Sequence, residues 1–241
     1  MARARPEDAR DRRRAAIERV PLFARLEPAQ LEALAAATTT RRLAAREELY
    51  HKGDVASQVY VVASGRLKIT STSVEGDEVV LNLLDAGEVV GELPMLIGGQ
   101  RTATVVALEP SELVVLERRD FLRFLREHPE SSVTLLAAMA ERVVRLSEYL
   151  EDTIFLGVGL RIAKRLLSLA DQFGEEEHDG AVVLAIKLSQ GELASYVGTT
   201  RETVNKQIRA WTDAGILQMT GGAITIRRRD ELEKLAGLAV S

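Results

Sequence analysis

The sequence predicts an α+β protein of 241 residues with three consecutive parts: an N-terminal antiparallel β jelly-roll, one long helix, and a C-terminal helix-turn-helix domain that ends in a hairpin. Short apolar runs separated by glycines between residues 41 and 117 predict the jelly-roll. Apolar residues at steps of three and four after residue 129 predict the long helix. Two short helical patterns joined at Gly198 predict the last domain. The expected boundaries are a flexible basic arm over 1–18, the barrel over 19–128, the long helix over 129–156 and the C-terminal domain over 157–241.

The composition excludes several classes of protein. With 46% hydrophobic and 28% charged residues, the chain is ordinary for a globular protein. No apolar run approaches the roughly 20 residues that cross a bilayer, and the Arg-rich start lacks the apolar core of a signal peptide. We therefore expect a cytoplasmic protein with no membrane partner. The chain has no cysteine, and its histidines (His51, His128 and His178) lie far apart, so we expect no metal or redox site.

The N-terminal half changes pattern near residue 41. Residues 15–38 carry the apolar spacing of a helix, whereas the basic segment before them predicts a solvated arm. After residue 41 the apolar runs shorten and alternate, which indicates strands of a small antiparallel barrel. The expected strands cover residues 58–62, 66–70, 79–84, 102–108 and 113–116.

One long helix is expected from about residue 130 to 155. Its apolar residues follow the spacing of a coiled-coil seam, and they are Leu136, Met139, Val143, Leu146 and Leu150. The partner that such a seam indicates is a second copy of the chain, so we expect a homodimer. The alternative is a helix packed on its own barrel.

Two glycines, Gly157 and Gly159, then offer a joint before a second helix over residues 160–173. The acidic run 175–179 is interpreted as a solvated loop, with a surface for a partner protein as the alternative. Residues 181–186 predict a short apolar strand.

The helix-turn-helix follows from local signals. Ser189 and Glu192 have the spacing of a capping box, Gly198 allows a tight turn, and Thr199 or Thr200 can cap the next helix. Three residues of that helix, Val204, Ile208 and Trp211, recur at steps of four and three and are expected to face the core.

The opposite face of the second helix has the chemistry of a DNA reader. It carries Arg201, Glu202, Asn205, Lys206 and Arg209. Arginine can donate two hydrogen bonds to guanine, and glutamate can accept one from cytosine in the major groove. Hydroxyl donors to phosphates are expected from Ser189, Thr200 and Thr203, and residues 218–226 predict a wing hairpin. Double-stranded DNA is therefore the expected partner, although an exposed charged face alone is more often only solvated.

A lone cation marks a second candidate site. Arg101 is the only Lys or Arg within residues 69–117, and its neighbours are glycines and small or apolar residues. Burying an unpaired guanidinium is costly, so Arg101 needs an anionic partner. Glu92 of the same barrel is one candidate. The other is a ligand phosphate bound by Arg101, Thr102 and backbone amides after Gly91, with Glu92 accepting from a ribose hydroxyl.

These motifs together resemble the cyclic AMP receptor protein and FNR family of bacterial transcription regulators, from about residue 20 to 229. The family's phosphate-binding motif is matched by Gly91, Glu92 and Leu93, followed by Arg101, Thr102 and Ala103. Its recognition helix commonly begins Ser-Arg-Glu-Thr-Val, matched here by Thr200, Arg201, Glu202, Thr203 and Val204. The resemblance implies a cyclic-nucleotide-binding-like barrel, a parallel dimer through the long helix and a winged helix-turn-helix.

For cyclic AMP responders the resemblance also implies site roles. Glu92 is expected to contact the ribose, Arg101 and Thr102 the cyclic phosphate, and Arg142 and Ser147 of the long helix the base. Leu146 departs from the pattern, because those responders have a threonine there that reads the adenine amino group. In eukaryotic relatives a threonine beside the motif arginine is associated with guanine, so cyclic GMP stays open beside cyclic AMP.

The resemblance leaves a second interpretation: a constitutive regulator with no cyclic nucleotide or with a different effector. On DNA it implies a palindromic site resembling TGTGA, read less strictly at one base pair because Lys206 replaces the usual arginine. It also implies RNA polymerase as a candidate partner of residues 175–179. We expect an effector to shift a conformational equilibrium, with no enzymatic step, because the dispersed histidines provide no metal cluster or activated nucleophile.

Overall fold

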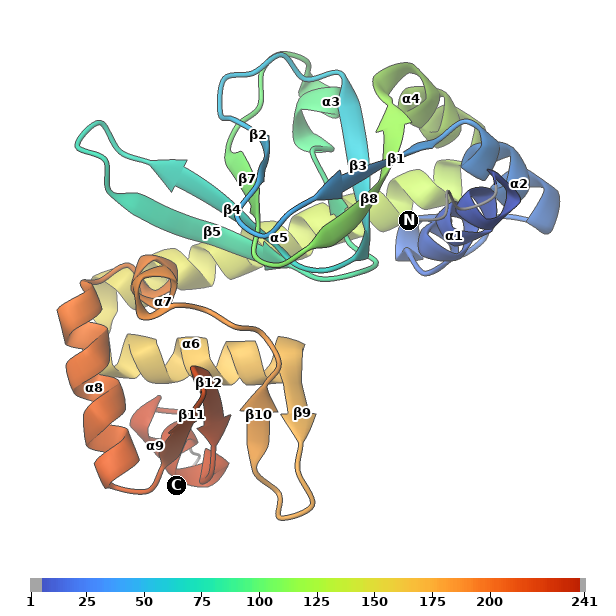
Figure 1. Ribbon diagram of the computed structural model, residues 1–241. Helices are drawn as coiled ribbons and strands as arrows, with labels where there is room; N and C mark the ends of the chain where they lie inside the picture. Colours follow the sequence, from blue (N-terminus) through green and yellow to red (C-terminus); the bar gives the residue numbers. More distant parts are fainter. Residues whose placement is uncertain (1–5, 239–241) are drawn as a thin grey trace. The chain divides into compact units, whose positions relative to one another are not determined.

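The computed structural model describes residues 6–238, and Figure 1 shows the order of their helices and strands. These residues divide into two compact units, one formed by residues up to 71 together with 81–143 and the other by 72–80 together with residues from 144 onward. Each unit has its own core and is described separately. Within the described residues, no helix combines the length and apolar character needed to cross a membrane.

The first unit contains the predicted antiparallel jelly-roll. One sheet has the strand order β1-β8-β3-β6 and the other the order β2-β7-β4-β5. Apolar side chains from both sheets form one core cluster, so the sheets pack face to face. The strands are β1 (Thr39–Leu43), β2 (Glu48–Tyr50), β3 (Gln58–Ser64), β4 (Leu67–Thr72), β5 (Glu78–Leu84), β6 (Val89–Val90), β7 (Thr104–Ala107) and β8 (Ser111–Glu117).

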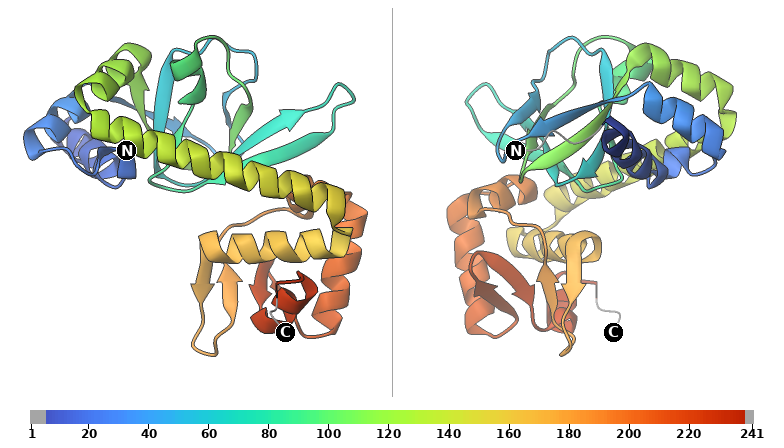
Figure 2. Two further views of the ribbon diagram at one scale, coloured as in Figure 1. Left: turned by 180° about the vertical axis from the view of Figure 1, so that it is seen from behind. Right: turned by 45° about the vertical axis from the view of Figure 1, so that its right-hand side comes forward.

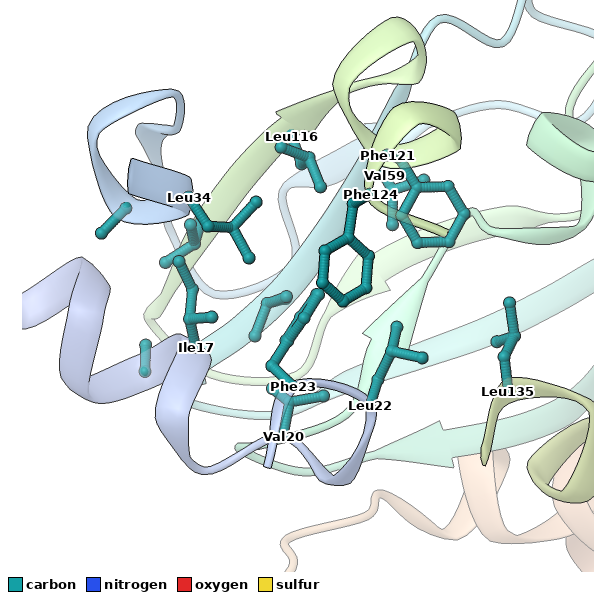
Figure 3. Close-up of a cluster of buried hydrophobic side chains, with 14 of the residues drawn as sticks. Ile17, Val20, Leu22, Phe23, Leu34, Val59, Leu116, Phe121, Phe124 and Leu135 are labelled. Carbon is teal, nitrogen blue, oxygen red and sulfur yellow. The ribbon is translucent and has the colours of Figure 1, made fainter. Parts of the chain in front are cut away.

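Strand β3 is buried on both of its faces. Because side chains alternate along a strand, Tyr60 and Val62 enter the cluster between the sheets, whereas Val59 and Val61 enter a second cluster. Figure 3 shows this second cluster, in which Phe23 and Phe124 meet edge to face with ring centroids 4.9 Å apart. The helices that contribute to it include α1 (Pro6–Glu18), the 3-10 turn η1 (Pro21–Phe23), α2 (Pro28–Ala36) and α4 (Arg118–Glu127).

The prediction of a flexible arm over residues 1–18 is wrong for residues 6–18, which form α1. These residues form a helix because α1 packs on the outer face of β3 and β8 and removes the apolar side chains of that face from water. Ile17 contributes to this packing and is only 1% exposed, and Arg13 Nε donates to the carbonyl of Ala35 at 3.3 Å. Residues 1–5, the rest of the predicted arm, lie outside the described residues.

The long helix α5 (Pro129–Phe155) confirms the prediction made from the sequence, and Figure 2 shows it as one continuous helix. Most of the predicted seam is exposed in the single chain: Leu136, Val143, Leu146 and Leu150 expose 59–64% of their surface. Met139 differs, because it packs partly against the cluster beneath the helices of the first unit. The division between the two units falls inside α5, between Val143 and Val144, and not at the predicted joint after residue 156.

The second unit contains the predicted helix-turn-helix and wing. Its sheet has the order β11-β12-β10-β9, and its core includes the fully buried Ile162, Leu166 and Leu193. Its remaining elements are α6 (Val158–Phe173), β9 (Gly174–Glu176), β10 (Val182–Leu184), α7 (Gln190–Val197), α8 (Arg201–Asp213), β11 (Leu217–Thr220), β12 (Ala223–Ile226) and α9 (Arg229–Leu235).

The acidic run 175–179 is not only the solvated loop that the sequence predicted. Its first residues belong to strand β9, which pairs with β10. Glu177 and Asp179 accept from Nη1 of Arg227 at 3.1 and 2.7 Å, because the adjacent strands bring the end of β12 beside the β9–β10 turn.

Candidate functional site

Arg101 lies just before β7, and its guanidinium is buried in the first unit, with the whole residue only 4% exposed. Nη2 donates to the carbonyl of Gln58 at 2.8 Å and Nη1 to the carbonyl of Gly91 at 3.3 Å. Its Cζ lies 4.0 Å from the ring centroid of Tyr50 and 5.5 Å from that of Tyr60. Carbonyl dipoles and ring faces attract a cation without neutralising it. The guanidinium has five N–H donors, so donors remain for an anion.

Gly91 lets the backbone approach this guanidinium. Its φ of +85° lies in the region that favours glycine, and a Cβ at this position would lie 2.5 Å from Nη1 of Arg101. The requirement for glycine therefore comes both from the backbone conformation and from the space that Arg101 occupies.

Glu92 does not form the ion pair with Arg101 that the sequence offered as one alternative. Its Oε1 accepts from Nη1 of Arg142 on α5 at 3.0 Å, and the Glu92 side chain is only 8% exposed. Burial raises the pKa of the Glu92 carboxyl, and a backbone hydrogen bond and the charges of Arg142 and Arg101 oppose that effect. The part of α5 that belongs to the first unit is thereby tied to Glu92 by an ion pair near the middle of the helix.

The other predicted pocket residues are placed differently from one another. Thr102 is exposed beside Arg101, Leu93 is half-buried in the short helix α3 (Leu93–Ile97), and Ala103 belongs to the barrel core. Ser147 is exposed on α5 and belongs to the second unit, so it is not brought to this site within one unit.

Tyr50 and Tyr60 are site residues that the sequence reasoning missed. Burial raises the pKa of the Tyr50 hydroxyl, so this side chain stays neutral at physiological pH. The hydroxyl of Tyr60 donates to Oε1 of Gln58 at 3.0 Å. Only Tyr60 lies on an expected strand, and nothing in the sequence indicates that both rings face one cation.

The helix-turn-helix has the local geometry that its sequence predicted. The hydroxyl of Ser189 accepts from the backbone N–H of Glu192 at 3.2 Å, and the Glu192 carboxylate accepts from the Ser189 N–H at 2.9 Å. The same carboxylate accepts from the Ser189 hydroxyl at 2.8 Å, which occupies the donor expected for a phosphate. Gly198 ends α7 in the left-handed conformation. Thr200 caps α8 by accepting from the N–H of Thr203 at 3.2 Å.

Helix α8 separates a buried face from an exposed charged face. Val204, Ile208 and Trp211 are buried, as predicted. The side chains of Arg201, Glu202, Lys206 and Arg209 are exposed. Thr203 is half-buried and shares a 2.8 Å hydroxyl contact with Thr200. Asn205 is also half-buried, and its Oδ1 is buried without a hydrogen-bond partner among the described residues, so it is less available to DNA than predicted.

Two of the three arginines after the wing hairpin, Arg227 and Arg229, contribute less positive charge than their sequence implies. Arg227 pairs with Glu177 and Asp179, and Arg229 pairs with Asp171 at 2.6 Å and Glu233 at 2.9 Å. The exposed basic side chains of α8 are therefore the main cationic feature of the helix-turn-helix.

A barrel with a buried, incompletely neutralised guanidinium followed by a winged helix-turn-helix with an exposed charged helix face is the domain organisation of a transcription regulator. Residues 40–128 match the family model of the cyclic nucleotide-binding domain, and residues 160–235 match that of the Crp-like helix-turn-helix domain. Over residues 6–238, no group of His, Cys, Asp and Glu side chains has the arrangement of a metal site.

Relatives cover almost the whole chain. It is 30% identical over 91% of its length to 98% of the CRP-like cAMP-activated global transcriptional regulator of Mycobacterium tuberculosis, and 33% identical, with the same coverage, to the cyclic AMP receptor protein of Thermus thermophilus. The crystal structure of a CRP/FNR-family transcriptional regulator from Thermus thermophilus is similar with a TM-score of 0.65 and 25% identity, covering 83% of this chain and 98% of that one. The chain belongs to the CRP/FNR family of transcription regulators.

Proposed function

We propose that the protein is a homodimeric regulator that binds cyclic AMP in the barrel and a palindromic TGTGA-like site through its two helix-turn-helix domains. The observation that carries the ligand assignment is Arg101, a buried guanidinium held by carbonyls and rings with donors left for an anion. A cyclic phosphate is the anion that the domain's ligand class supplies. Two relatives that span nearly the whole chain are described as cyclic AMP responders.

In this proposal the pocket residues have separate tasks. Arg101 and the exposed Thr102 bind the cyclic phosphate, and Gly91 leaves room for the arginine. Glu92 accepts from a ribose hydroxyl through the same carboxylate whose Oε1 accepts from Arg142. Leu93 and Ala103 shape the pocket wall, and Arg142 and Ser147 of α5 contribute to binding of the base.

The identity of the base rests on fewer observations. Leu146 replaces the threonine that reads adenine in the family's cyclic AMP responders, and it can offer a base only apolar contact. Thr102 keeps cyclic GMP as the competing effector. Leu146 also favours the second candidate function, a constitutive regulator of the same family with no cyclic nucleotide or another effector.

The homodimer is supported by the exposed apolar side chains of α5. Leu136, Val143 and Leu150 recur at steps of seven residues, and Leu146 lies between the last two, which is the pattern that buries against a second helix of the same kind. Leaving four such side chains exposed is unfavourable, and pairing with the same helix of a second copy removes them from water.

On DNA, we propose that the exposed face of α8 carries the reading residues. Arg201 and Glu202 in its first turn are proposed to contact base edges, and Lys206 and Arg209 to contact bases or phosphates further along. Thr200 and Thr203 are proposed phosphate contacts, with Ser189 and Asn205 as weaker members of the set because their polar atoms are partly engaged or buried. Glu175 and Glu176, exposed on β9, remain candidates for contact with RNA polymerase.

Calorimetric titration of the full chain with cyclic AMP and with cyclic GMP tests the effector. We expect a Kd on the order of micromolar for one nucleotide and loss of binding in Arg101→Ala. Arg42→Ala, which removes an exposed arginine from β1 of the same barrel, is the matched control and should bind normally. No heat with either nucleotide, together with DNA binding in their absence, would establish the constitutive alternative.

The base-reading role of Arg201 is tested with the same protein on two kinds of DNA. Arg201→Ala should lose about 1–3 kcal/mol of binding free energy on the specific site and little on random duplex. Equal losses on the two duplexes would contradict a base contact and leave only a phosphate contact.

A further inference from the structure

An arginine lies between two tyrosine rings in the second unit. The Cζ of Arg165 on α6 is 4.4 Å from the ring centroid of Tyr149 on α5 and 5.3 Å from that of Tyr196 on α7. Both distances are within the range of cation–π attraction. The stack Tyr149–Arg165–Tyr196 therefore joins the long helix to the first helix of the helix-turn-helix through α6.

The Tyr149 hydroxyl also reaches the turn between α7 and α8. A Cβ on Gly198 would lie 2.8 Å from that oxygen, and the φ of Gly198 is +75°. The left-handed turn that sets the direction of α8 thus lies directly against the side chain of Tyr149 on α5. Tyr149 therefore reaches α7 in two ways, with its ring through Arg165 and with its hydroxyl at the turn.

Two further interactions hold the same part of α5 to α6. Lys164 Nζ lies 2.6 Å from Oδ1 of Asp152, and Arg161 Nη1 donates to the carbonyl of Thr153 at 3.2 Å. These contacts bridge the Gly157–Gly159 segment that the sequence predicted as the joint. They explain why residues after 144 of α5 group with the DNA-binding unit.

We propose that Tyr149 is a positioning residue for DNA recognition: it fixes the direction of α8 relative to the C-terminal part of α5, and so sets the distance between the two recognition helices of a dimer. The proposal rests on the proposed homodimer that reads two half-sites. The exposed seam occupies another side of the helix and stays available for the partner copy.

The geometry of DNA binding is the measurement that separates positioning from mere stability. A half-site is first selected from random duplexes with the wild-type protein. Duplexes are then made with two copies of it at centre-to-centre spacings from about 8 to 13 base pairs, around the one-turn spacing that dimers of this class use. Affinities are measured by fluorescence anisotropy for each spacing and for a single half-site, with cyclic AMP added at saturation and omitted.

We expect the wild-type protein to prefer one spacing by about tenfold and Tyr149→Ala to reduce that preference to about twofold or less. Binding to the single half-site should change little, because the exposed face of α8 is untouched. Tyr149→Phe keeps the ring and should keep most of the preference. Glu148→Ala, an exposed neighbour on α5, is the matched control and should behave as wild type.

Three outcomes decide the proposal. Retention of the wild-type spacing preference by Tyr149→Ala overturns it. If Tyr149→Ala does not fold, as judged from the fluorescence of Trp211, the only tryptophan of the chain, then Arg165→Met takes its place. This variant removes the cation between the rings and should reduce the preference for one half-site spacing in the same way. A wild-type protein that binds paired half-sites no better than single ones overturns the proposed dimeric function itself, whatever the variants do.

Discussion

At the scale of single residues, the pocket depends on a glycine that leaves space for a buried arginine. Replacing Gly91 with alanine places a methyl group 2.5 Å from Nη1 of Arg101 and forces a side chain into a positive φ. We expect Gly91→Ala to cost about 1–2 kcal/mol of folding stability and to weaken cyclic-nucleotide binding more than tenfold, because the guanidinium must move.

Thermal unfolding and calorimetric titration of the same preparation measure both effects. Gly76→Ala is the matched control: this glycine also has a positive φ, +93°, but nothing lies within 4 Å of its added Cβ. It should lose stability and keep ligand affinity. Unchanged affinity in Gly91→Ala would show that the position of Arg101 does not determine binding.

Glu92 makes the stability of the barrel depend on pH. Its pKa in the folded protein is raised above the ordinary value of 4.5 by burial, so the folded state binds this proton more tightly than the unfolded state does. The stability that the protonated group contributes is present below pH 4.5 and is lost as the pH rises through the folded pKa. Glu92→Gln cannot ionise and should gain stability relative to wild type over that window.

Urea unfolding of wild type and Glu92→Gln from about pH 4.5 to about pH 7.5 measures this difference. Glu75→Gln, which makes the same change at an exposed carboxylate in the hairpin after β4, is the matched variant. A difference for Glu92→Gln that does not vary with pH would mean that the ion pair with Arg142 offsets the burial completely.

How far single site residues can be predicted depends on whether the signal is local. Arg101 stood out because no other cation occurs in residues 69–117, and Gly91 because it precedes the motif glutamate. The pairing of Glu92 with Arg142 joins positions 50 residues apart. The rings around Arg101 come from two other strands, so only the fold reveals them.

At the scale of elements, α5 carries two kinds of surface. One side contacts its own chain through Arg142, Tyr149 and Asp152, and another exposes the apolar seam. Regular spacing predicted this helix correctly, and the role of its apolar residues as a dimer seam stays a prediction. The spacing could not predict that Met139 turns partly into the first unit, because a step of three or four residues fixes the side of the helix but not what covers it.

Leu150→Glu should dissociate the dimer. Leu150 is 59% exposed in the single chain, and in a two-fold seam the new carboxylate would meet its own copy in a desolvated contact. The expected cost is several kcal/mol of association free energy. Sedimentation equilibrium should show a dimer for wild type and for Ala137→Glu, an exposed position outside the seam, and a monomer for Leu150→Glu. A dimeric Leu150→Glu would place the interface elsewhere.

The elements of the barrel show why helix α1 was missed. The strand pattern was visible because alternation and glycine turns are local, whereas α1 is rich in charge and lacks a strong apolar stripe in sequence. Its helical state depends on the outer face of β3 and β8, where Val59, Val61 and Leu116 need a cover. A prediction from the local sequence pattern cannot take that apolar surface into account, because strands distant from α1 in the sequence form it.

At the scale of the whole molecule, the joint between the two units is the feature that the sequence predicted least well. Gly157 and Gly159 marked a flexible connection, but an ion pair from α6 to Asp152 and a hydrogen bond to Thr153 hold the chain on both sides of it. The compact units instead divide inside α5. Glycines make a backbone segment able to bend, but the contacts around the segment determine whether it bends.

A regulator of this kind must show equal coupling in both directions. If cyclic AMP raises the affinity for DNA by some factor, thermodynamic linkage requires bound DNA to raise the affinity for cyclic AMP by the same factor. We expect a factor of about 5–150, the usual range for coupled sites. Anisotropy with and without saturating nucleotide gives the first factor, and calorimetric titration of nucleotide into free and DNA-bound protein gives the second.

Three results are possible, and each decides between functions. Two equal factors above one establish that effector and DNA bias one conformational equilibrium, and Arg101→Ala should then bring the first factor to one while DNA binding without nucleotide persists. Two factors of one, with strong DNA binding, identify the constitutive regulator that Leu146 favours. Unequal factors cannot arise from a single dimer binding both partners at equilibrium, so they would show that nucleotide also changes the assembly state. Repeating the titration at several protein concentrations would then reveal the shift, because the coupling factor within one dimer does not depend on protein concentration, whereas a monomer–dimer equilibrium does.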